Sequence, residues 1–345
     1  MTWSDAKLDA ARGCGDEAAD RLVAGLAGRV WQVNALLRGV RRNDDPLPAS
    51  LPDEVRRFFA TAAALPPWLD RTRVLAAQSW AQRHLFHITV ALFCASLPST
   101  YAAARGARVL LGTGRMQAEL DRRVNETARF TLDILRPGSL DPSGSALVAI
   151  RKVRLIHAAV RALVPSLEPG EVAINQEDLL GTLIGFSVVV IRSLRRMGVD
   201  IDAGAAEDFY GLWRCVGAVL GVRDDMLPRD VAAACCAAER IVERQFRASP
   251  HGQALMANLL TRMVAHVDVP GLRTSPQVLV RYLLGDRTAE LLGIPAADES
   301  IARSLVLRGL GATGRLVGRR LLDTVVAVKL DGAPVHFDMP TRVLQ

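Results

Sequence analysis

The sequence has few aromatic residues, no paired cysteine motif and no apolar run as long as a membrane span. Aromatic residues make up 5% of the 345 residues, and the five cysteines include no CxxC pair. An odd number of cysteines without a CxxC pair is typical of a reducing compartment. The longest apolar run, Leu179–Ile191, is interrupted by glycine and threonine and is shorter than the ~20 residues that span a bilayer. These absences argue against a disulfide scaffold and against a membrane span.

The beginning of the chain also lacks a targeting signal. Residues Met1–Asp5 contain neither the basic segment nor the apolar core of a signal peptide. On this basis we expect a soluble, cytoplasmic protein.

The residues that are present favour helices. Hydrophobic residues make up 50% of the chain and charged residues 23%, and the mixture of Ala, Leu, Val and Arg favours helix over strand. Long helical patterns without Asn-Gly hairpin signals predict an all-α fold. We expect one helix from Ile174 to Met197 and another over Glu207–Leu220. We also expect an N-terminal helical extension at residues 1–60, one large domain at residues 61–327 and an irregular tail at residues 328–345.

The positive charge of the chain does not point clearly to nucleic acid. The net charge is +7 and the pI about 9.6, mostly from arginine. The arginines are spread through amphipathic helices, and no helix-turn-helix, zinc-finger or RNA-binding motif is present. We therefore expect no nucleic-acid partner, and some arginines are available to bind anionic cofactor groups.

The stretch Arg151–Arg161 carries the strongest functional signal. It lies in the segment Ala146–Val164, which has no Gly or Pro inside it and places apolar residues at helical spacing around His157. Arg154 and Arg161 flank this histidine on the same side of the helix. The positive charges of the two arginines disfavour a protonated imidazole, and a neutral imidazole can act as a metal ligand. The guanidinium groups themselves are suited to binding carboxylates. A haem, with an iron and two propionates, would satisfy all three side chains.

The same spacing has a simpler interpretation. His157 can be a satisfied core histidine, with the two arginines extending their apolar stems toward the surface. Spacing alone favours this interpretation over haem. A covalently attached c-type haem is excluded because the chain has no CxxCH motif.

A second group of polar side chains lies on a helix predicted over residues 116–135. Arg123, Glu126 and Thr127 can share one face of this helix, which would bring a cation, an acid and a hydroxyl together. The alternative is an internal Arg123–Glu126 ion pair, with Thr127 hydrogen-bonded to its own helix.

Two further motifs give weaker signals. His84 and His87 lie three residues apart on a helix, but a lone pair does not complete a metal site, so two partly buried polar side chains are the favoured interpretation. The segment Gly106–Gly114 lacks the strand and the lysine of a phosphate loop, and we predict a turn there.

The motifs taken together resemble a known family. The pattern Arg154-x-x-His157-x-x-x-Arg161, preceded by Arg123-x-x-x-Thr127, resembles the latex clearing proteins (rubber oxygenases) and the broader family of mpaB-type oxygenases. The further blocks that agree in order and spacing are Leu65–Asp70, Ile174–Asp178 and Trp213–Gly221.

This resemblance implies an all-α, globin-reminiscent domain that encloses a b-type haem without covalent attachment. It implies that His157 is the proximal iron ligand, that Arg154 and Arg161 support the haem, and that Arg123 and Thr127 lie on the distal side. It also implies O2 as the co-substrate, since a single axial histidine leaves one coordination position open. Rubber oxygenases cleave the carbon–carbon double bonds of polyisoprene.

The sequence departs from the rubber-cleaving branch at the distal side. Glu126 stands where that branch carries a lysine as distal iron ligand, and Ala107 stands where it carries its proposed base. Glu126 or Glu119 would have to take the role of the base. Polyisoprene is also too large to enter a cell. We therefore expect a haem-b-dependent oxygenase in which Arg123, Glu126 and Thr127 act on an unsaturated, terpenoid- or lipid-like small molecule.

Three other functions stay open at this point. A haem-based peroxidase could use Glu126 as its acid–base group. A haem protein could bind a gas or another ligand without turnover. A helical protein without haem could bind an apolar ligand, with its arginines in ion pairs. The sequence indicates no oligomeric state.

Overall fold

Helices form the regular structure in the residues that a computed structural model describes, which are 3–61, 65–112, 126–164, 168–265 and 275–296. Within these ranges there is no strand, and an isolated bridge joins Ala103 to Phe246. The predicted all-α fold is confirmed, while the predicted tail at residues 328–345 lies outside the described residues. The elements in chain order are α1 (Asp5–Arg12), α2 (Glu17–Gly25), α3 (Val30–Leu37), α4 (Asp53–Thr61), α5 (Arg71–Arg83), α6 (Leu85–Ala91), the π-helix η1 (Leu92–Ser96), α7 (Leu97–Ala102), α8 (Ala104–Gly112), a helix at residues 126–134, α10 (Ala146–Leu163), α11 (Gln176–Phe186), α12 (Val188–Arg196), α13 (Ala203–Leu220), the 3-10 turn η2 (Asp224–Met226), α14 (Val231–Gln245), α15 (Pro250–Ala265), α16 (Ser275–Leu284) and α17 (Asp286–Leu291).

Local sequence sets where the central helices begin and end. The side chains of Asn175 and Asp202 accept hydrogen bonds from backbone N–H groups in the first turns of α11 and α13, which otherwise have no partner inside a helix. The Asp202 cap starts α13 at Ala203, earlier than the predicted start at Glu207. Gly221 takes a left-handed conformation with φ of +96° and ends α13 where the sequence predicted.

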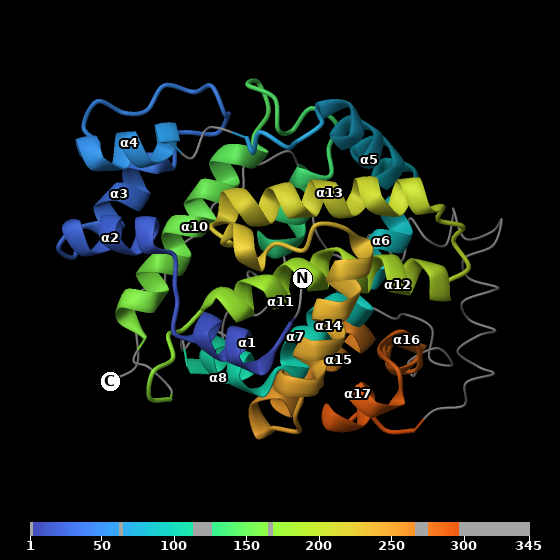
Figure 1. Ribbon diagram of the computed structural model, residues 1–345. Coiled ribbons are helices and arrows are strands. Elements are labelled where there is room, and N and C mark those ends of the chain that lie inside the picture. The colour runs from blue at the N-terminus through green and yellow to red at the C-terminus, as the bar shows by residue number, and fades with distance from the viewer. Residues whose placement is uncertain (1–2, 62–64, 113–125, 165–167, 266–274, 297–345) are drawn as a thin grey trace.

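Helix α10 lies between two hydrophobic clusters (Figure 1). Val148, Leu155 and Ala159 pack with buried side chains of α2, α3 and α4. Ile150 belongs to the main core, where α10 also contacts α13. Because both sides are covered, most of α10 is buried, and the helix has nearly the length that its sequence predicted.

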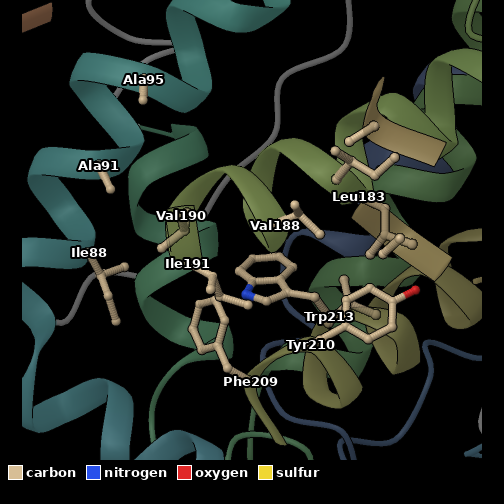
Figure 2. Close-up of a cluster of buried hydrophobic side chains, with 14 of the residues drawn as sticks. Ile88, Ala91, Ala95, Leu183, Val188, Val190, Ile191, Phe209, Tyr210 and Trp213 are labelled. Carbon is tan, nitrogen blue, oxygen red and sulfur yellow. The ribbon is translucent and has the colours of Figure 1, made fainter. Parts of the chain in front are cut away.

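The main core forms where α13 meets α11, α12 and the α6–η1 segment. Figure 2 shows Phe209, Tyr210 and Trp213 of α13 among aliphatic side chains from these helices. The indole of Trp213 stacks on Phe186, with ring centroids 5.0 Å apart, and meets Phe209 edge-on at 6.5 Å. Tyr210 donates its hydroxyl to the carbonyl of Pro228 at 2.7 Å. These large buried rings fix α13 across the helices that line the functional site.

The structure differs from the sequence prediction at two places. Gly106 lies inside α8 and not in a turn, because one glycine among good helix formers costs a helix only about 1 kcal/mol. Ser187 divides the predicted helix from Ile174 to Met197 into α11 and α12. Its hydroxyl donates to the carbonyl of Leu183 at 2.7 Å, a bond that bends helices, and its backbone has φ of −114° and ψ of −81°.

One helical stretch in the described part of the chain, Leu85–Ala102, is long and apolar enough to span a membrane. It runs through α6, η1 and α7, and 67% of it is buried inside the protein. A core helix of a soluble protein meets the same criterion, so the stretch is weak evidence for a membrane span.

We predict that Gly221→Ala destabilises the fold. A Cβ at Gly221 would overlap the carboxylate of Asp16 and lie 2.9 Å from Nε of Arg154, and the positive φ is strained for alanine. The free energy of unfolding should fall by about 2–4 kcal/mol, measured by urea denaturation followed by circular dichroism.

Gly25→Ala at the end of α2 is the matched control. An added Cβ there meets nothing within 4 Å, and Gly25 lies in a helix, so alanine should stabilise the protein by roughly 0.5–1 kcal/mol. Equal effects of the two substitutions would contradict the role assigned to Gly221.

Candidate functional site

A cavity of about 800 Å³ lies between the helices of the main core. Its walls come from α7, α8, α10, α11, α12, α13 and α14, together with the helix at residues 126–134. Most of the lining is apolar, and the volume falls within the ~300–1,000 Å³ that is usual for small-molecule pockets. The polar side chains on the walls therefore mark the places where chemistry can occur.

The first polar group lies where α10 faces the cavity. His157 lines the wall beside Val153 and Val160 of the same helix, and the residue is half-buried. The buried face predicted around this histidine therefore borders an open volume and not a filled core. A ligand inside the cavity can reach the imidazole.

The predicted distal residues reach the same cavity from a second helix. Glu126 and Thr127, at the start of the described helix 126–134, both line it. Arg123 lies outside the described residues. The structure thus brings an imidazole, a carboxylate and a hydroxyl from two helices to one largely apolar space.

Arg154 and Arg161, predicted to support a haem, have other partners. Arg154 donates from Nη2 to Oδ1 of Asp16 at 2.9 Å and from Nε to the other carboxylate oxygen. Arg161 donates from Nε to Oδ1 of Asp20 at 2.7 Å. Both arginines are absent from the lining of the described cavity. Their ion pairs attach the beginning of α2 to α10, and their contact with a haem stays a prediction.

Helical geometry explains this separation. At about 100° per residue, Arg154 and Arg161 lie roughly 50° to one side of His157, and Val153 and Val160 lie roughly 50° to the other side. The two valines line the cavity, and the two arginines meet the N-terminal segment. The sequence spacing predicted that Arg154, His157 and Arg161 lie on one side of α10. It could not show which part of that side faces the cavity.

A second polar group, at the start of α11, was not assigned any chemistry from the sequence. Glu177 is buried and accepts hydrogen bonds from Arg12 at 3.0 Å, Arg244 at 3.0 Å and Gln245 at 2.8 Å. Asp178 accepts from Arg12 at 3.3 Å, and both acids border the cavity. Burial raises the pKa of Asp178 to about 6. In the sequence, two acids in the first turn of a helix indicate only where the helix begins. Nothing in the sequence indicated that Glu177 is buried or that both acids border the cavity.

The indole of Trp213 provides a buried donor in the cavity wall. Its Nε1 has no hydrogen-bond acceptor among the described residues, although the ring stacks on Phe186, which also lines the cavity. An indole N–H can only donate, and a buried donor without an acceptor costs about 1–3 kcal/mol. An oxygen atom of a ligand could satisfy it.

The donor set fits a haem better than a metal held by side chains alone. No group of three His, Cys, Asp or Glu residues suited to a metal occurs within the described ranges. The rings of His84 and His87 lie 6.3 Å apart, and burial lowers the pKa of both. Haem iron needs only one axial side chain in an apolar pocket, which His157 and the cavity can provide.

Comparisons with known proteins agree with the resemblance seen in the sequence motifs. Residues 83–316 match the family described as "ER-bound oxygenase mpaB/B'/Rubber oxygenase, catalytic domain". Over 323 residues the chain is 30% identical to the rubber oxygenase of Streptomyces sp. (strain K30), with 87% of this chain and 78% of that protein covered. The fold is similar to that of latex clearing protein LCP in the closed state, with a TM-score of 0.83, 26% sequence identity and 99% of each chain covered.

We predict that Asp178 makes the stability of the protein depend on pH. Its pKa rises from 3.8 to about 6 on folding, so between these values the folded chain binds more protons than the unfolded chain. The free energy of unfolding therefore falls as the pH rises through this interval. In the wild type we expect this fall in the free energy of unfolding to be about 1–3 kcal/mol. Asp178→Asn, whose amide oxygen can still accept from Arg12, should abolish it. Urea titrations at about pH 4 and pH 7 measure the difference.

Asp224→Asn provides the control, because Asp224 is an exposed carboxylate on η2. This variant should keep the pH dependence of the wild type. If Asp178→Asn also kept it, Asp178 would not be the group responsible.

Proposed function

The chain belongs to the family of mpaB-type oxygenases and rubber oxygenases, and we propose that it is a haem-b-dependent oxygenase acting with O2 on an apolar, unsaturated small molecule. In this proposal His157 is the proximal iron ligand. Arg123, Glu126 and Thr127 act on the distal side. The observation that carries the proposal is that His157, Glu126 and Thr127 line one largely apolar cavity.

Each side chain has a separate task. A neutral imidazole at His157 can bind the iron and leave the opposite side open. A bound haem supplies the one-electron and O2 chemistry that side chains lack. Glu126 accepts or returns a proton at its carboxylate, and Thr127 donates a hydrogen bond from its hydroxyl to an oxygen that gains negative charge. The apolar walls exclude water, which strengthens both interactions.

The remaining walls favour a hydrocarbon substrate. Phe186, Val189, Val216 and Leu220 present ring and aliphatic surface to the cavity, which binds carbon chains by excluding water. The cavity of about 800 Å³ would hold the haem and leave the remaining space for a small substrate. The Streptomyces relative is named for rubber, and for this chain we propose a terpenoid- or lipid-like substrate with a double bond.

A peroxidase is the second candidate, and Glu126 is the observation that favours it. A carboxylate in an apolar cavity that would also hold a haem could move the proton that peroxide cleavage requires. The two activities differ in the oxidant that they consume, which makes them separable by experiment.

We predict that His157→Ala removes the haem. The purified wild type should show a Soret band, and the variant should lose its haem content roughly tenfold or more, since it loses the axial side chain. Absorption spectra and pyridine haemochrome analysis measure this.

His87→Ala is the control, because His87 is a half-buried histidine of α6 that does not line the cavity. It should keep the wild-type haem content. An unchanged Soret band in His157→Ala would refute the assignment of the proximal ligand.

We predict that Glu126→Gln slows turnover without releasing the haem. The amide keeps the size of the side chain but cannot carry a proton, so O2 uptake in the presence of an alkene should fall by roughly 10²-fold. An oxygen electrode measures the rate, and the Soret band reports haem content. Wild-type turnover that requires peroxide and consumes no O2 would instead establish the peroxidase.

A further inference from the structure

Three arginines gather at the end of the cavity that α12 forms. Arg192, Arg195 and Arg196 all line the cavity, and all three are exposed. The cavity therefore opens toward solvent at this end. Figure 1 shows α10, which carries His157, and α12 on opposite sides of the molecule, with α11 between them.

The arginines differ in the partners that they already have. Arg192 pairs with Glu239 at 3.2 Å, and both side chains are largely exposed. Arg196 donates to two backbone carbonyls at the end of α16, at 2.8 and 3.0 Å. The side chain of Arg195 makes no hydrogen bond or ion pair with the residues that the structure describes. Its guanidinium is the one at this opening that can accept a new anionic partner without breaking a contact seen in those residues.

Stabilisation of α12 explains only part of this arrangement. Cations in the last turn of a helix interact favourably with its negative end, which accounts for Arg195 and Arg196 at the end of α12. It does not account for three arginines in the lining of an apolar cavity. A pure hydrocarbon offers these groups no partner, whereas a carboxylate forms short, charge-assisted and often bidentate hydrogen bonds with arginine.

Most of the cavity wall is apolar. Leu183 and Phe186 of α11, Val189 of α12 and Val216 of α13 all line the cavity, and the two acids at the start of α11 border it as well. Figure 1 shows α12, whose arginines line the cavity, and α10, which carries His157, on opposite sides of α11, so the positive charge and the imidazole lie on different parts of a largely apolar wall. A molecule with a charged head and a long apolar chain can reach from one to the other.

We propose that the substrate is an unsaturated chain with a terminal carboxylate. The carboxylate binds the guanidinium of Arg195, with Arg192 and Arg196 adding positive charge, and the chain extends along the apolar walls toward His157. The reaction at the double bond rests on the proposed oxygenase function, but the binding of the carboxylate does not. One guanidinium without a partner among the described residues matches a singly charged head, whereas a diphosphate would need more cations.

The test compares ligands that share one chain and differ in the head group. A fluorescent polyene fatty acid is bound to the purified full-length protein with its haem, and is displaced by oleate, methyl oleate or oleyl phosphate. The wild type should bind oleate about tenfold more tightly than methyl oleate. Arg195→Gln should bring this ratio close to one, and Arg195→Glu should reverse the preference. Haem content, read from the Soret band, should stay unchanged in both variants.

Arg83→Gln is the matched control, because Arg83 is an exposed arginine at the end of α5 that does not line the cavity. It should keep the wild-type ratio. A wild type without a preference for oleate, or an Arg195→Gln variant that keeps the preference, would overturn the proposal.

Two further outcomes would also overturn it. Loss of haem from Arg195→Gln with an unchanged ligand preference would assign the arginine to a haem propionate. Tighter binding of oleyl phosphate than of oleate would reject a carboxylate as the head group. Because binding is measured without turnover, a clear preference for oleate in a protein that takes up no O2 would refute the proposed oxygenase function and leave this inference standing.

Discussion

The ion pairs between α10 and the N-terminal segment decide which side of α10 faces the cavity. Arg154 and Arg161 bind Asp16 and Asp20, and the apolar side chains of α2, α3 and α4 complete the contact. The side chain of Arg161 is only 5% exposed, whereas that of Asp20 is 35% exposed, so solvent partly screens this pair and it contributes less than a fully buried one. With this side of the helix covered, the side that carries His157 borders the cavity.

The polar groups on the cavity wall come from different helices. His157 lies on α10, Glu126 and Thr127 lie on the helix at residues 126–134, the two acids lie on α11 and the arginines lie on α12. Most of the remaining wall is apolar. Such a wall suits chemistry on a hydrocarbon, because apolar burial supplies binding along the chain while hydrogen bonds act only where charge develops.

Features that depend on local sequence could be predicted well. The bounds of α10 and the end of α13 at Gly221 follow from apolar spacing and from glycine, and the residues around His157 are sufficient to indicate the family. The break at Ser187 was not predictable from periodicity, because the apolar pattern continues through it and the bend comes from one hydroxyl bonded to its own helix.

Features that depend on distant contacts could not be predicted. Asp16 and Arg154 are 138 positions apart in sequence, so nothing near Arg154 indicated that its charge already has a partner. Likewise, Asp178 has the sequence context of an ordinary helix start, and its raised pKa results from burial that only the packed structure shows. The spacing of polar residues indicated candidate side chains but not which of them face the cavity.

The assignment of His157 as the proximal ligand can be tested by resonance Raman spectroscopy of the reduced, purified protein, because this method reports the atom that binds the iron. We expect an iron–histidine vibration that shifts when the protein is prepared with ¹⁵N-labelled histidine and that disappears when His157 is replaced. A correctly folded protein that contains no haem, or a haem whose iron–ligand vibration is insensitive to both changes, would contradict the assignment.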